Sequence, residues 1–371
     1  MNEDGHVSIP RRGYIAAGLA AAVVGSLGVI STLTAGADEV SAAPAAVAAA
    51  PGAPLPPAEL PWGEEPEPVK KGAPGATSAT LAATGADIAP DDASGSLVPE
   101  AEFSPKGYTS KKRTLRKSRT TVAPQPPLTQ LAPGQENNVK YHYATAYQYV
   151  QSEGSYANLV IGKPKLADDD YHTLAEIAVQ TADTKQTVEV GWTVDRGVNG
   201  DEDPHLFVYH WVDGKETCYN ACGFRQYSKS VIPGDTLPVG VSKRFGIQYY
   251  NGAWWIAYDS EWVGYFEDKL WNVPFTKSGL VQWFGEVAST SSKPCSAMGT
   301  GAEASSTAAG RIGTIALLGK DAQGQDLQVN FTTELKSPDH APNTGVYQID
   351  KRSDRTFRYG GPGYVGPLRK C

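Results

Sequence analysis

From about Val139 to the C-terminus, the sequence consists of short segments that are typical of β-strands, and helix signals are nearly absent. Tyr, Val, Thr and Trp dominate these segments, and Gly, Pro, Asn and Asp lie between them. Many short strands without intervening helices indicate an antiparallel sandwich or barrel. The sequence therefore predicts an all-β fold. The expected strands are residues 139–150, 156–161, 173–181, 186–194, 205–212, 238–250, 253–259, 280–290, 310–319 and 325–333, and one helical turn is expected at residues 267–271.

The N-terminal third has a different composition. Ala, Pro, Gly and Ser dominate it, whereas the part after residue 136 holds seven of the eight tryptophans. A segment so poor in large apolar side chains cannot bury enough surface to offset the entropy lost on folding. We therefore expect residues 38–136 to be an Ala/Pro-rich and basic disordered linker or pro-segment, and residues 137–371 to be the folded domain.

Residues 1–37 have the pattern of an export signal. Arg11 and Arg12 precede an uncharged run of small and apolar residues, which ends in Ala35-Gly-Ala37, a typical cleavage pattern. The paired arginines resemble a twin-arginine signal, and a Sec signal fits as well. An uncleaved membrane anchor is the alternative, because the run is long enough to span a bilayer. Both interpretations predict that the rest of the chain lies outside the cytoplasm.

The four cysteines fit an oxidising compartment. They allow three disulfide connectivities, which the sequence does not distinguish. We expect Cys218–Cys222 within a turn and Cys295–Cys371 at the C-terminus. Zinc is the alternative for the first pair, but no second Cys or His pair has the spacing of zinc ligands. We expect no metal and no cofactor.

Charge gives little indication of a partner. The formal net charge of −7 favours no nucleic-acid partner. The basic run at residues 106–119 could bind a polyanion or be a processing site, although a solvated tract explains it more simply. The acidic loop at residues 195–203 hints at calcium, but Leu206 occupies the twelfth position, where an EF-hand has glutamate. A turn between two strands is the simpler interpretation.

Two expected strands carry a glutamate in the middle. Glu189 lies on the face opposite the valines and the tryptophan of its strand, and Glu286 repeats this pattern in a second strand. Strand glutamates usually face solvent, but two such strands side by side would bring two carboxylates together. Gly191 and Gly285 lie beside them and would leave room for a substrate backbone.

Other catalytic signatures are missing from the sequence. It contains no G-x-S-x-G, no H-E-x-x-H and no P-loop motif. His205 and His210 lie on one expected strand, and their odd separation points them to opposite faces, which excludes a shared metal or triad. A cysteine nucleophile is not expected, because the disulfides would use every thiol.

Several short motifs follow one another in a fixed order: His142–Tyr147, Val188–Val194, Cys218–Asn220 with Cys222–Phe224, Ala253–Ile256, Val263–Tyr265, Val281–Val287 and Tyr359–Gly363. Together they resemble the neprosin family of glutamic peptidases. The resemblance covers about residues 139–363. It implies a two-sheet antiparallel β-sandwich and a metal-free, acid-active endopeptidase that typically cleaves after proline.

The resemblance assigns the catalytic pair to Glu189 and Glu286. The family has Gly-Gly-Glu where this sequence has Phe284-Gly-Glu286, so a phenylalanine would reshape the cleft and affect proline preference more than catalysis. Adjacent Trp254 and Trp255 must point to opposite sides of their strand, one into the core and the other toward the cleft. The expected cleft residues are Gly191, Gln282, Phe284, Tyr265 and Trp255.

Two carboxylates in one site cannot both ionise at low cost, so one stays protonated while the other accepts a proton from water. A weakly acidic optimum follows. We expect a secreted monomer that acts on protein or peptide substrates, including proline-rich ones, with a membrane partner only if the N-terminal segment is uncleaved. The alternatives are a non-catalytic β-sandwich binding module for glycan or cell wall, and a glycosidase.

Overall fold

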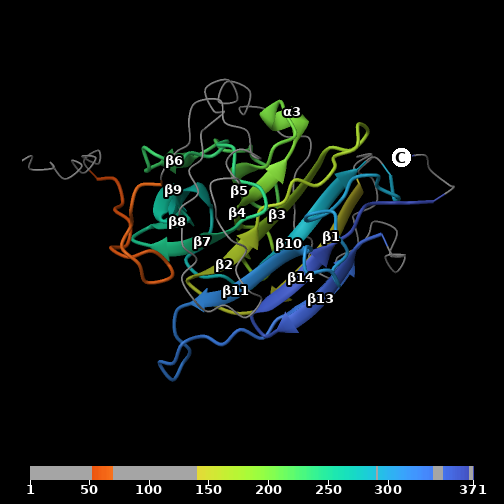
Figure 1. The fold of residues 1–371 in the computed structure, drawn as a ribbon. Coiled ribbons are helices and arrows are strands. Elements are labelled where there is room, and N and C mark those ends of the chain that lie inside the picture. Colours follow the sequence, from red (N-terminus) through yellow and green to blue (C-terminus); the bar gives the residue numbers. More distant parts are fainter. Residues whose placement is uncertain (1–51, 70–139, 290, 337–345, 367–370) are drawn as a thin grey trace, which may run out of the picture. The chain divides into compact units, whose positions relative to one another are not determined.

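Two antiparallel sheets pack face to face in a computed structural model of the chain, which describes residues 52–69, 140–289, 291–336, 346–366 and 371 (Figure 1). Six strands form the first sheet in the order β12-β1-β10-β3-β4-β5, and eight form the second in the order β13-β14-β11-β2-β7-β8-β9-β6. The strands are β1 Lys140–Gln148, β2 Gly154–Val160, β3 His172–Gln180, β4 Thr187–Val194, β5 His205–Trp211, β6 Phe224–Gln226, β7 Ser242–Tyr250, β8 Ala253–Tyr258, β9 Glu261–Glu267, β10 Leu280–Ser289, β11 Gly310–Leu318, β12 Thr332–Lys336, β13 Gln348–Ser353 and β14 Thr356–Gly360.

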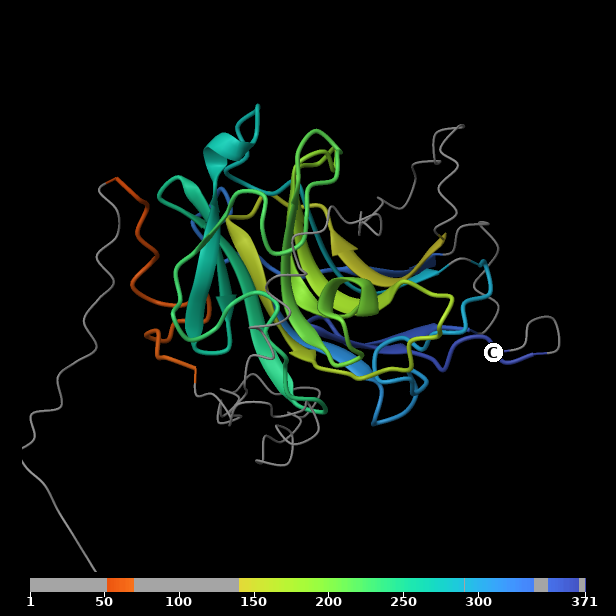
Figure 2. The same ribbon diagram turned by 90° about the horizontal axis from the view of Figure 1, so that it is seen from above.

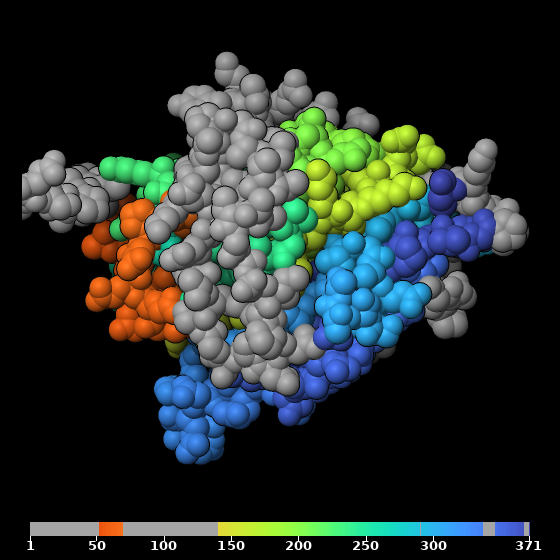
Figure 3. Space-filling model, viewed as in Figure 1, coloured from red at the N-terminus to blue at the C-terminus, as the bar shows by residue number. Residues whose placement is uncertain are grey.

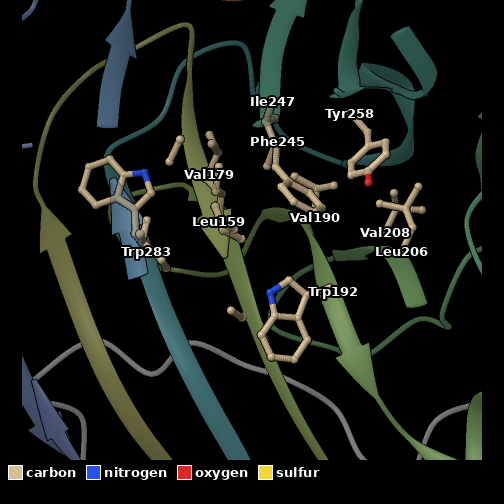
Figure 4. Packing of buried hydrophobic residues seen from close by; sticks show 14 of the residues in the cluster. Leu159, Val179, Val190, Trp192, Leu206, Val208, Phe245, Ile247, Tyr258 and Trp283 are labelled. Atoms are coloured by element: carbon tan, nitrogen blue, oxygen red, sulfur yellow. The ribbon is translucent and has the colours of Figure 1, made fainter. Parts of the chain in front are cut away.

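The core lies between the sheets and holds the apolar half of each alternating strand. Trp192 and Trp283 of the first sheet are fully buried there with Phe245 and Ile247 of the second (Figure 4). Burying side chains of this size contributes roughly 2–3 kcal/mol each. Both indole N–H groups are satisfied, since Trp192 donates to the Val160 carbonyl at 3.1 Å and Trp283 to Ser155 Oγ at 3.0 Å. This packing fixes which face of β4 and β10 points away from the core.

Most expected strands are present, and the all-β sandwich is confirmed. The exception among them is 325–333, because β12 begins only at Thr332. The strands β6, β9, β13 and β14 were not expected. β13 reads Gln-Ile-Asp-Lys-Arg-Ser, and such a polar composition suits an edge strand, which must avoid pairing with other chains. The 3₁₀ turn η1, Asp268–Leu270, lies within the predicted helical turn.

Disulfides join Cys218 to Cys222 and Cys295 to Cys371, as expected. The acidic loop after β4 contains one short helix, α3 Arg196–Asn199, whose first turn is capped by Asp195. Its Oδ1 accepts a hydrogen bond from the Val198 backbone N–H at 3.0 Å.

Residues 52–69, which we call the strap, pack against the outer face of the eight-stranded sheet beside β7, β8 and β9 (Figure 2). In the space-filling view the strap is the orange part of the surface (Figure 3). For residues 52–69 alone, this corrects the expectation of a disordered linker or pro-segment over residues 38–136, because Leu60 of the strap is buried. The remainder of that linker and the export signal at residues 1–37 lie outside the described residues. No described helix is both long and apolar enough to cross a membrane.

Candidate active site

Glu189 on β4 and Glu286 on β10 lie on the same face of the six-stranded sheet, with β3 between their strands. Glu286 pairs in register with Leu174 of β3, and Glu189 pairs with Ala178 of the same strand. Both side chains point away from the inter-sheet core, because their strand neighbours fill it. Both glutamates are nevertheless fully buried. The sheet therefore places the two predicted carboxyls on one face, on either side of a single strand.

A third glutamate, Glu176 of β3, lies between them. It pairs with Phe284 of β10 on one side and with Gly191 of β4 on the other, so in register it is midway between Glu286 and Glu189. It is fully buried, and neither carboxyl oxygen has a hydrogen-bond partner among the described residues. Such groups are rare in folded proteins because an unsatisfied buried oxygen costs about 1–3 kcal/mol. The face therefore carries three carboxyls.

Burial and mutual repulsion favour the neutral form of two of these carboxyls. Desolvation raises the pKa of Glu189 well above its ordinary value, and the charge of Glu286 raises it further. Desolvation also raises the pKa of Glu176 well above its ordinary value, and Glu189 and Glu286 add to this effect. The third carboxyl, Glu286, therefore ionises first.

Hydrogen bonds favour the ionised form of Glu286. His172 Nε2 lies 2.6 Å from Glu286 Oε1, and the Tyr143 hydroxyl also hydrogen-bonds this carboxyl. Desolvation raises the pKa of Glu286, and His172 and Tyr143 both oppose that rise. The surroundings of Glu189 stabilise a negative charge less, because the side chain seen to hydrogen-bond it among the described residues is the neutral Trp211, whose Nε1–H donates to Oε1 at 3.0 Å. The two glutamates are therefore electrostatically unequal.

His172 connects Glu286 to a further carboxyl. Its Nδ1 lies 3.8 Å from Asp195 Oδ2, close enough for an ion pair but too far for a hydrogen bond. Asp195 is the cap of α3, so the short helix helps to hold it beside the imidazole. The buried row Asp195–His172–Glu286 thus runs from the helix to the carboxyl face.

Glu176 and His172 are functional candidates that the sequence analysis missed. The signal was present: residues 172 and 176 share the parity of Leu174 and Ala178, which places them on one face of the strand. Leu174 and Ala178 lie on that same face, and their apolar side chains indicate a strand buried on both sides rather than a strand that carries site residues.

Aromatic side chains enclose the carboxyls. Tyr143, Phe207, Tyr209, Tyr219 and Phe284 form a buried cluster on this face. The disulfide loop Cys218–Cys222 carries Tyr219 and is attached to β5, because the Val208 backbone N–H donates to Asn220 Oδ1 at 3.0 Å. These rings shield the carboxyls from bulk solvent and so contribute to the desolvation that raises their pKa values.

Three expected cleft residues lie on this face. Phe284 packs its ring edge-on against Tyr143 at a centroid distance of 5.7 Å, and Gln282 Oε1 accepts from Gln180 Nε2 at 2.6 Å. Gly191 also lies here, but a Cβ at this position would be 2.1 Å from the Ala175 carbonyl oxygen. The space beside Gly191 is thus filled by β3, which corrects the expectation that this glycine leaves room for a substrate. Gly285 points into the core, where its Cβ would meet the Tyr359 ring at 2.2 Å.

The other two expected cleft residues, Trp255 and Tyr265, lie elsewhere. They belong to β8 and β9 of the eight-stranded sheet, where they pack with Leu60 on its outer face. Trp254 points into the core, so the two tryptophans do point to opposite sides. Strand alternation gave the side of Trp255 correctly but not the sheet. The positions of Trp255 and Tyr265 overturn their assignment to the cleft.

A family model described as Neprosin matches residues 169–362, just over half of the chain, and this stretch contains all three glutamates. The chain belongs to the neprosin family. Membership supports a peptidase. It also agrees with the resemblance that the motifs indicated.

Solved structures of similar architecture include glutamic peptidases. Scytalido-glutamic peptidase with a transition state analog inhibitor is 10% identical over 61% of this chain and 100% of that chain, with a TM-score of 0.37. SCP-B, a member of the Eqolisin family solved with the tripeptide Ala-Ile-His, is 11% identical over the same shares, with a TM-score of 0.36. The agglutinin CG-16 from chicken liver is 11% identical over 38% of this chain and 92% of that chain, with a TM-score of 0.24. Family membership of this chain rests on the family model.

Proposed function

We propose that this neprosin-family protein is a secreted glutamic endopeptidase, in which Glu189 and Glu286 form a catalytic dyad that works under acidic conditions. The observation that carries the proposal is a face with two buried glutamates whose hydrogen bonds make them electrostatically unequal. Paired carboxyls of unequal pKa are what acid–base hydrolysis of a peptide bond needs. Cleavage after proline is the specificity that the family resemblance implies.

In this mechanism Glu286 is the base. Its ionised carboxylate, hydrogen-bonded by His172 and Tyr143, takes a proton from water while the water oxygen bonds to the scissile carbonyl carbon. Glu189 stays protonated and donates a hydrogen bond to the carbonyl oxygen as negative charge develops there. The proton held by Glu286 then passes to the leaving nitrogen as the C–N bond breaks. Water thus supplies both the hydroxyl and the proton that the two products gain.

Glu176 has a separate part in this proposal. Its raised pKa keeps it neutral at the pH where Glu286 is ionised, so its O–H is a second hydrogen-bond donor beside the dyad. A neutral acid can also remain buried without the cost of a third negative charge. We propose that Glu176 donates to the bound peptide rather than exchanging a proton with it.

The extracellular location and the oligomeric state of the enzyme are also proposals. Two disulfides support an oxidising compartment, and the sequence of residues 1–37 supports export. We propose a monomer that hydrolyses unstructured protein or peptide substrates, including proline-rich ones.

The test is digestion of an unstructured, proline-containing protein by the secreted chain between about pH 3 and 7, with the cut sites mapped by mass spectrometry. Cleavage that disappears in both Glu189→Gln and Glu286→Gln is the expected result. Glu267→Gln is the matched control, because Glu267 is also a strand glutamate but lies at the end of β9 in the other sheet. Cleavage that persists in Glu286→Gln would reject the dyad.

A further inference from the structure

Four aromatic side chains form a surface on the outer face of the eight-stranded sheet, which we call the aromatic platform: Tyr227, Trp255, Trp262 and Tyr265. Their rings contact one another, with Trp255 at centroid distances of 4.5 Å from Tyr265 and 5.5 Å from Tyr227. The small residues Ala253 and Ala257 lie among them.

The strap that covers this platform is rich in proline. It contains six prolines within eighteen residues: Pro54, Pro56, Pro57, Pro61, Pro66 and Pro68. Proline fixes φ, so the strap loses less conformational entropy on docking than an ordinary segment would. Leu60 is 2% exposed and packs with Trp255 and Trp262 in one buried cluster. A turn after it, in which Gly63 N–H donates to the Leu60 carbonyl at 2.8 Å, reverses the chain.

Polar contacts fix the register of the strap on the platform. Trp262 Nε1–H donates to the Pro57 carbonyl at 3.2 Å. An indole N–H that reaches a proline carbonyl across an aromatic surface is how proteins bind proline-rich peptides. At the C-terminal end, the Glu67 backbone N–H donates to the Ser260 carbonyl at 2.7 Å, and Ser260 Oγ–H donates to the Glu67 carbonyl at 3.0 Å.

Charge adds a further contact. Arg244 of β7 donates to Glu64 Oε1 at 2.9 Å, and its guanidinium lies over the Trp62 ring at 5.0 Å. One arginine thus contacts both a carboxylate and an indole of the strap. The strap is therefore bound by apolar, hydrogen-bonding and ionic contacts together.

The only covalent connection between the strap and the sandwich is the chain segment of residues 70–139, because none of the four cysteines lies in the strap and no disulfide can join the two. We propose that the aromatic platform is a binding site for proline-rich peptide, and that it retains residues 52–69 as a non-covalent partner when the chain is cut within residues 70–139. The platform lies on the other sheet from the three glutamates, so this site is independent of the proposed catalysis.

The test is a cut at one defined position. The recognition site of a sequence-specific protease is placed between residues 100 and 101 of the secreted chain, and the cut protein is analysed at neutral pH by size exclusion at micromolar concentration. The N-terminal fragment is expected to elute with the sandwich. A labelled synthetic peptide of residues 52–69 should then replace it, whereas a scrambled peptide of the same composition should bind at least tenfold more weakly.

Leu60→Asp is the matched variant, because it changes the strap and leaves every residue of the sandwich unchanged. After the cut, its N-terminal fragment is expected to elute separately, with a melting transition of the sandwich still present. Three results would overturn the proposal: separation of the wild-type fragment, equal retention of the Leu60→Asp fragment, or a sandwich that unfolds when the strap leaves. The third would make the strap part of the fold rather than a ligand of it.

Discussion

The two outer faces of the sandwich are both covered by aromatic rings, but the rings bury different groups. On the eight-stranded sheet, Tyr227, Trp255, Trp262 and Tyr265 bury a strap whose polar groups largely find partners. On the six-stranded sheet, similar rings bury three carboxyls, and Glu176 has both oxygens without a hydrogen-bond partner among the described residues. The first arrangement suits binding. The second costs stability, which is the usual sign that a group is kept for chemistry.

The largest effect is expected on catalytic activity, when glutamates on the two sheets are replaced by glutamine and compared. Glu286→Gln or Glu189→Gln should lower kcat/KM for a peptide substrate by about 10³-fold or more, because a base or an acid of the proposed dyad is lost. Glu267→Gln, on the other sheet, should stay within about twofold of wild type. Equal losses in all three variants, measured by initial rates at the pH optimum, would remove the distinction between the faces.

His172→Gln should act on pH dependence rather than on activity alone. Without the interactions of His172 that oppose the rise caused by desolvation, the pKa of Glu286 rises, so the acidic limb of kcat/KM moves to higher pH. A shift of one unit would reduce activity about tenfold at the acidic end and little at the optimum. A purely structural role of His172 would instead lower the whole profile without moving the limb.

Stability should fall as pH rises. The folded-state pKa values of Glu176, Glu189 and Glu286 all lie above the ordinary value of 4.5, so the folded state binds more protons than the unfolded state above that pH. Each group therefore costs about 1.4 kcal/mol per pH unit from near its unfolded pKa up to its folded pKa. Urea unfolding from pH 4 to pH 7 measures this slope. Glu176→Gln should flatten it, and a slope identical to wild type would mean that Glu176 is not buried as a neutral acid.

The smallest effect on activity is expected for a Glu176 variant that keeps a neutral hydrogen-bond donor. Glu176→Gln keeps a neutral hydrogen-bond donor and should stay within about threefold of wild type in kcat, whereas Glu176→Leu removes the donor and should lose about tenfold or more. Steady-state kinetics at the optimum distinguishes the two. Equal activity in both variants would show that the third carboxyl has no part in turnover.

Strand parity in the sequence was enough to single out Glu189 and Glu286, because each glutamate lies on the strand face opposite a regular set of Val and Trp side chains. It could not give the neighbours of these strands. The order β1-β10-β3-β4 places β10 between β1 and β3, which are 100 or more residues away in the sequence, and only that order reveals His172 and Glu176 beside Glu286 as well as Glu189. For the same reason parity gave the side of Trp255 but not its sheet, and the expectation that Tyr265 lines the cleft was wrong as well. The docking of the strap was not predicted, because the composition of a segment does not show whether another part of the chain offers a surface onto which a residue such as Leu60 can pack.

The central claim is that Glu286 ionises while Glu189 stays neutral. Carboxyl ¹³C NMR titration of glutamate-labelled protein measures this directly, with Glu189→Gln, Glu286→Gln and Glu176→Gln used to assign the three signals. Glu286 is predicted to titrate at the lowest pH of the three, and Glu189 and Glu176 well above it. Titration of Glu189 at or below the pH of Glu286, or of all three near the ordinary value of 4.5, would contradict the account.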